Sequence, residues 1–145
     1  MTTTETTPAA SETEEAGAAE STPIEAMTAA IDAHLEAYGD PDAARRATAV
    51  AAIWATDGSL IDPPIDGRGH DGITALGDVV QAHFAGNTFR RTTVVDAHHG
   101  VARYGWALVA PDGATTMTGL DVAEFDAAGK LTRIVGFFGE LTPTP

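Results

Sequence analysis

The spacing of apolar residues changes near Gly86, and this change constrains the fold more than any other feature of the sequence. Before Gly86 the apolar residues recur at intervals of three and four, which is typical of amphipathic helices. After it, β-branched and aromatic residues cluster between closely spaced turn residues, which is typical of antiparallel strands. This order predicts an α+β fold, with a curved, mostly antiparallel sheet wrapped around three N-terminal helices.

Local signals place the individual elements. Gly39 ends the first helix, Asp71 can cap the third, and Pro111-Asp112-Gly113 is typical of a hairpin turn. The predicted helices cover residues 24–38, 41–55 and 71–84, and the predicted strands cover residues 59–62, 92–97, 101–110, 115–125 and 131–141.

The first 22 residues differ from the rest of the chain in composition. They contain five Glu and no basic or aromatic residue. Such a segment cannot bury enough apolar surface to offset the entropy lost on ordering it. We therefore predict a disordered acidic tail over residues 1–22 and one folded domain over residues 23–142.

The charge balance excludes several classes of partner. The chain has 21 acidic and 8 basic residues, a formal net charge of -13, which repels nucleic-acid phosphates and anionic lipids. We expect no nucleic-acid or membrane binding. Because residues 1–22 lack the basic and apolar regions of a signal peptide, we expect a cytoplasmic protein. The absence of cysteine excludes disulfides and thiolate metal sites.

Two segments resemble ketosteroid isomerases and SnoaL-like proteins of the NTF2-like superfamily. Residues 54–63, with Asp62-Pro63 at their end, and residues 67–73 are similar to that group's second helix, first strand, Asp-Pro loop and third-helix start. Residues 119–140 are similar to its final hairpin. The resemblance covers about residues 24–141. It implies a cone-shaped fold with an internal pocket, and a homodimer that pairs through the outer face of the sheet.

The resemblance also implies four candidate catalytic residues. Asp62 falls where ketosteroid isomerases keep the carboxylate that carries the proton, and Asp121 falls where they keep a protonated acid in the oxyanion hole. The place of the family's oxyanion tyrosine is taken by His34 or by Tyr38, depending on how the first two helices are aligned. Both alternatives stay open at this stage.

The residue pattern supports a pocket around these acids. Alternation along residues 117–125 places Asp121 on the same face as Met117, which we expect to be the inner face. In the other register Leu120, Val122 and Glu124 would point inward. The predicted substrate-binding wall comprises Trp54, Tyr104, Trp106, Leu108, Met117, Ile134 and Phe138.

These features favour an enzyme that moves a proton at a carbon next to a carbonyl, in isomerisation or polyketide-type cyclisation of a hydrophobic small molecule. The alternative is a non-catalytic module of the same fold that binds a hydrophobic ligand or mediates dimerisation. Epoxide hydrolase or dehydratase chemistry is less favoured, because the epoxide reaction needs an inward arginine and Arg103 falls on the outward face. We expect no cofactor and no metal, since the adjacent His98 and His99 would point apart or lie in an exposed turn.

Overall fold

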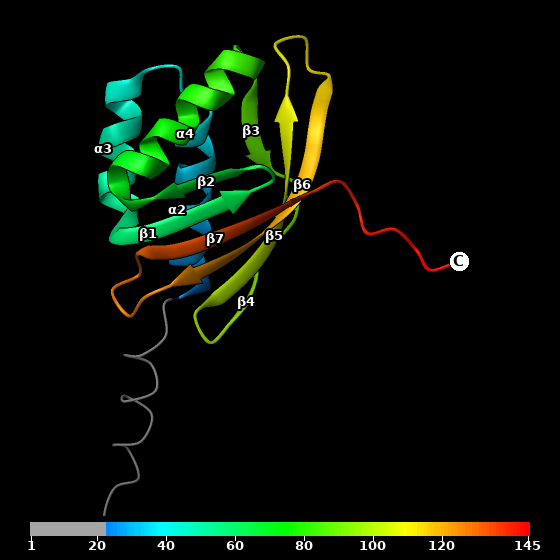
Figure 1. Ribbon diagram of the computed structural model, residues 1–145. Helices are drawn as coiled ribbons and strands as arrows, with labels where there is room; N and C mark the ends of the chain where they lie inside the picture. The colour runs from blue at the N-terminus through cyan, green and yellow to red at the C-terminus, as the bar shows by residue number, and fades with distance from the viewer. Residues whose placement is uncertain (1–22) are drawn as a thin grey trace, which may run out of the picture.

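A curved sheet wraps around three helices, as Figure 1 shows for the computed structural model, which describes residues 23–145. This arrangement confirms the predicted α+β class with a mostly antiparallel sheet. The predicted tail over residues 1–22 lies outside the described residues. Within residues 23–145, no helix is long and apolar enough to cross a membrane.

The helices form where apolar residues recur at helical spacing. They are α2 (Ile24–Tyr38), α3 (Ala43–Ile53) and α4 (Gly69–Phe84). The Asp42 side chain caps α3 by accepting hydrogen bonds from the backbone N–H groups of Ala44 and Arg45, at 2.9 and 3.1 Å. The second helix is shorter than predicted because Trp54 already begins a strand, and the third starts two residues before Asp71.

Seven strands of the described chain form one mixed sheet. They are β1 (Trp54–Asp62), β2 (Ile65–Arg68), β3 (Thr88–Arg91), β4 (Asp96–His98), β5 (Val101–Val109), β6 (Thr115–Phe125) and β7 (Leu131–Phe138). Their order is β2-β1-β7-β6-β5-β3, and β4 also pairs with β5. Neighbouring strands are antiparallel except β1 and β7, which run parallel. Residues from the middle and the end of the chain therefore meet at the β1–β7 junction.

The predicted strand over residues 92–97 is wrong. The chain forms two shorter strands instead, β3 and β4, which pair with successive parts of β5. Between them the Thr92 N–H donates to the Gly105 carbonyl, and the Thr93 hydroxyl accepts from the Gly105 N–H, both at 2.9 Å. A side-chain bond replaces part of the regular ladder here, and alternation of residue types does not reveal such a break.

Two other strands differ from the prediction in length. β1 begins at Trp54 rather than at residue 59, because α3 passes directly into it. β7 ends at Phe138 rather than at Leu141, since Gly139 adopts a positive φ of 76° and turns the chain away.

The core lies between the helices and the inner face of the sheet. Along β6, Asp121 and Ala123 are buried whereas Leu120 and Glu124 are exposed, which confirms the predicted register. The largest side chains that are almost completely buried are Trp54, Tyr104, Ile31, Leu60, Ile73, Leu108, Leu131 and Ile134.

Arg46 joins α3 to α4. Its side chain is 3% exposed, donates to the Asp40 backbone carbonyl at 2.7 Å and forms an ion pair with Asp78. Gly77 on α4 provides the space for it, because a Cβ atom at that position would overlap the guanidinium group. This contact fixes α4, whose C-terminal half borders the cavity described below.

Replacing Gly77 with alanine should lower the free energy of unfolding, although alanine is normally about 1 kcal/mol better than glycine inside a helix. The new methyl group must displace Arg46, which is buried and already bonded. Gly72→Ala in the same helix is the matched control, since its nearest contact would be an ordinary 3.5 Å. Thermal melting checks the pair, and equal stability of the two variants would contradict this role of Gly77.

Candidate functional site

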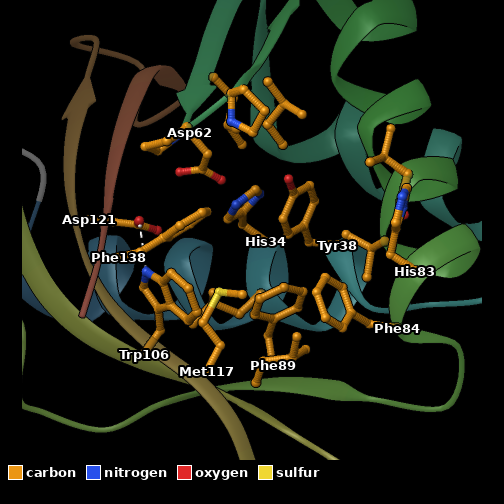
Figure 2. Close-up of a pocket in the computed structure, with 18 residues that line it drawn as sticks. His34, Tyr38, Asp62, His83, Phe84, Phe89, Trp106, Met117, Asp121 and Phe138 are labelled. Atoms are coloured by element: carbon orange, nitrogen blue, oxygen red, sulfur yellow. Dashed lines mark hydrogen bonds between the residues drawn. The ribbon is translucent and has the colours of Figure 1, made fainter.

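A cavity of about 320 Å³ lies between α2, α4 and the inner face of the sheet. Figure 2 shows that acidic side chains gather at one end of it and aromatic rings along its walls. Its lining consists of His34, Leu35, Tyr38, Leu60, Asp62, Pro63, Pro64, Ile65, Val79, Val80, His83, Phe84, Phe89, Trp106, Leu108, Met117, Asp121 and Phe138. All four predicted catalytic residues are in this lining.

Asp62 is the last residue of β1, where Pro63 and Pro64 turn the chain away from the sheet. Its carboxyl group lies at the acidic end of the cavity, and its Oδ1 atom is buried without a hydrogen-bond partner. Burial raises the pKa of Asp62 to about 6, and the hydroxyl of Tyr38 opposes this rise. Asp62 can therefore change its protonation state near neutral pH.

Asp121 lies on the inner face of β6 and is 5% exposed. Its Oδ2 accepts a hydrogen bond from the Tyr104 hydroxyl at 2.8 Å, and its Oδ1 accepts one from Trp106 Nε1 at 2.9 Å. Burial raises the pKa of Asp121 to about 7, and the charge of Asp62 contributes to this rise to a smaller extent. The two hydrogen bonds act in the opposite direction. The site thus contains two neighbouring acids that both titrate near neutral pH.

His34 and Tyr38 lie one turn apart on α2, with their rings stacked at a centroid distance of 5.5 Å. Burial lowers the pKa of His34 to about 4, so its imidazole is neutral at pH 7. The Tyr38 hydroxyl points toward Asp62 (Figure 2). Burial raises the pKa of Tyr38, and the charges of Asp62 and Asp121 raise it further. Both side chains line the cavity, and the hydroxyl of Tyr38 faces the acids.

The predicted substrate-binding wall is only partly in the cavity. Four of its residues, Trp106, Leu108, Met117 and Phe138, line it. The other three, Trp54, Tyr104 and Ile134, are packed in the core and are not among the lining residues.

The three core residues have identifiable positions. Trp54 packs edge-on against His34 at 5.5 Å, and Tyr104 contributes through its hydroxyl bond to Asp121. Ile134 lies two residues before Gly136 on β7, away from the cavity end. Alternation identifies the inner face of a strand, but it does not tell how far along that face the cavity extends.

Sequence reasoning missed the wall formed by α4 and β3. Val79, Val80, His83 and Phe84 line the cavity from α4, and Phe89 lines it from β3. The apolar stripe of the third helix was a usable signal for the α4 wall. The segment containing Phe89 is a strand of four residues, Thr88–Arg91, and carried no such signal, so it was not predicted as a strand.

The site contains no arrangement suited to a metal ion. Among residues 23–145, no three His, Asp or Glu side chains lie close enough to hold one. The cavity lining contains neither Lys nor Arg. Besides the two carboxyls, the ionisable side chains of the lining are therefore His34, Tyr38 and His83.

Solved structures give the clearest comparisons. A proposed isomerase of the SnoaL-like family from Agrobacterium tumefaciens is 28% identical, with a TM-score of 0.75 over 80% of this chain and 99% of that one. A proposed SnoaL-like polyketide cyclase from Jannaschia is 13% identical, with a TM-score of 0.64 over 81% of this chain and 89% of that one.

A third structure is a hypothetical protein with a ketosteroid isomerase-like fold from Catenulispora acidiphila, in complex with trimethylamine. It is 10% identical, with a TM-score of 0.61 over 76% of this chain and 85% of that one. No protein-family model and no curated protein matches the sequence. The chain therefore has the NTF2-like fold, and its structural relatives are SnoaL-like and ketosteroid isomerase-like proteins.

Proposed function

We propose that this protein is an isomerase- or cyclase-like enzyme that moves a proton at a carbon next to a carbonyl group. The observation that carries the proposal is the pair of neighbouring carboxyl groups, Asp62 and Asp121, at the end of an apolar cavity. An efficient general acid or base has a pKa close to the working pH. Burial gives both acids this property.

In the proposed step, the ionised Asp62 takes a proton from the carbon next to the carbonyl. The electron pair of the broken C–H bond moves into the enolate, and its negative charge develops on the substrate oxygen. Asp121 in its protonated form, with Tyr38 or His34, donates hydrogen bonds to that oxygen. Return of the proton from Asp62 to another carbon completes an isomerisation, so no atom is gained or lost. Between about pH 6 and 7, an ionised Asp62 and a protonated Asp121 can coexist.

The cavity supports a hydrophobic substrate without negative charge. Its lining is largely apolar and aromatic, and it contains no Lys or Arg that would balance a carboxylate or phosphate. Its volume of about 320 Å³ suits one small molecule of a few rings. An anionic substrate would have to approach the acid pair against its charge.

Binding of a hydrophobic ligand without chemistry is the second candidate function. The apolar lining supports it, and a protein of the same fold forms a complex with trimethylamine. Epoxide hydrolysis has less support, because Arg103 is exposed and pairs with Asp96 at 2.8 Å. Neither Arg90 nor Arg91 is part of the cavity lining.

A homodimer is proposed as the assembly in solution. Leu120 and Phe137 are paired neighbours on the outer face of β6 and β7, and they are 37% and 56% exposed. Covering such adjacent apolar side chains favours association.

Sedimentation velocity at high micromolar concentration should give a dimer. Phe137→Ser should weaken this dimer, whereas Val94→Ser, at an exposed position elsewhere, should not. A single species near 14.9 kDa would contradict the dimer.

Asp62→Asn should reduce kcat/KM by at least about 10²- to 10⁴-fold, because an amide cannot act as the base. The probe is a panel of bicyclic β,γ-unsaturated ketones, whose conjugated products are detected by ultraviolet absorbance. The melting temperature should be retained. Asp57→Asn is the matched control, since Asp57 is exposed on the same strand and should keep full activity.

The wild-type rate should also rise as the pH increases through about 6, where Asp62 becomes ionised. A fully active Asp62→Asn variant would show that Asp62 is not the base. If the wild-type protein binds these ketones but turns none of them over, the ligand-binding function is favoured instead.

A further inference from the structure

Gly136 lies beneath both carboxyl groups of the site. It stands opposite Asp121 in the β6–β7 pairing. The parallel β1–β7 pairing ends at Ile61 and Val135, so Asp62 is the next residue along β1. A Cβ atom at Gly136 would overlap Asp62 Oδ1 and lie 3.0 Å from Asp121 Oδ1. Carboxyl oxygens from two neighbouring strands thus occupy the space where β7 would otherwise carry a side chain.

We propose that Gly136 is a positioning residue that lets Asp62 and Asp121 share one proton and act as a single acid–base unit. Asp62 Oδ1 is buried and has no hydrogen-bond partner. Such an atom is costly unless a proton is shared with it. Besides the Tyr38 hydroxyl, which also acts on Asp62, the candidate partner is Asp121 Oδ1, because both carboxyl oxygens lie close to the position that a Cβ atom of residue 136 would take.

The hydrogen bonds of Asp121 allow this sharing. Each of its oxygens accepts one bond, from Tyr104 or from Trp106, and a carboxylate oxygen has room for a second. One proton can therefore lie between Asp62 Oδ1 and Asp121 Oδ1, on either carboxyl group, without breaking either bond. When it is on Asp121, Asp62 is ionised, which is the form that the proposed reaction requires. The indole N–H of Trp106 is a donor only, so it requires an acceptor at Oδ1 in either state of the pair.

The cavity lining contains no Lys or Arg that would balance the charge of the pair. His34 on α2 is neutral at pH 7, and Tyr38 and Tyr104 have raised pKa values. His83 lines the cavity from α4, and its ring bonds the Val79 carbonyl of its own helix. Arg133, the basic residue of β7, is exposed on the outer face. Two adjacent carboxylates without a cation disfavour double ionisation, so one proton is retained.

The proton sharing is inferred from the placement of the two carboxyl groups, whereas its use in catalysis rests on the proposed function. The two ideas can therefore be tested separately. Titration of the carboxyl groups needs no substrate, and turnover needs no knowledge of where the proton lies.

The experiment is an NMR titration of the aspartate carboxyl carbons in the full chain. When it is the only substitution, Asp121→Asn should lower the apparent pKa of Asp62 by at least about 1 pH unit relative to the wild type, which is the usual threshold for coupled titration. Gly136→Ala should remove this dependence because the methyl group displaces Asp62. Gly105→Ala is the matched control, since it makes the same change within a strand and the atoms nearest to its Cβ would be those of the Thr92 and Thr93 side chains and the Gly119 carbonyl.

Two results would overturn the proposal. One is a folded Gly136→Ala variant in which both acids keep their raised, mutually dependent pKa values. The other is an unchanged Asp62 titration in Asp121→Asn, and this measurement decides the matter even if Gly136→Ala fails to fold. Coupled titration in a protein that turns over no ketone would support the shared proton and count against the proposed reaction.

Discussion

The site depends on the parallel pairing of β1 with β7. Without it, Asp62 at the end of β1 would have no reason to lie near Asp121 on β6, because β2, α4, β3, β4 and β5 come between them in the chain. The pairing places the end of β1 beside Gly136, and the antiparallel β6–β7 ladder places Asp121 on its other side. Two hydrogen-bonded ladders therefore hold the carboxyl groups close together, so their proximity does not depend on flexible side-chain contacts.

This placement has an energetic cost, because the cavity around the two carboxyl groups is apolar. Two carboxylates in an apolar cavity without a cation are unfavourable, and their pKa values rise until at least one of them holds a proton near neutral pH. Tyr104 and Trp106 reduce the cost for Asp121 by donating to both of its oxygens. Asp62 has no such donor at Oδ1. These donors oppose the rise in the pKa of Asp121, but burial and the charge of Asp62 still raise that pKa to about 7.

Much of the fold could be predicted from residue spacing, because periodicity reports which face of an element is buried. The helix over residues 24–38 and the inward face of the strand carrying Asp121 were predicted in this way. Spacing could not predict the break between β3 and β4, which depends on a Thr93 side-chain bond. Nor could it show that Trp54 and Tyr104 lie in the core, because the depth of a cavity depends on how all three helices pack.

The proposed function requires this acid pair to move protons to and from carbon. The most direct test is to incubate the full chain with a hydrophobic bicyclic ketone in deuterium oxide and to follow, by NMR, exchange of the proton on the carbon next to the carbonyl. We expect catalysed exchange by the wild-type protein, with a loss of at least about 10²-fold in Asp62→Asn. Exchange no faster than in buffer, or equal exchange by both proteins, would contradict it.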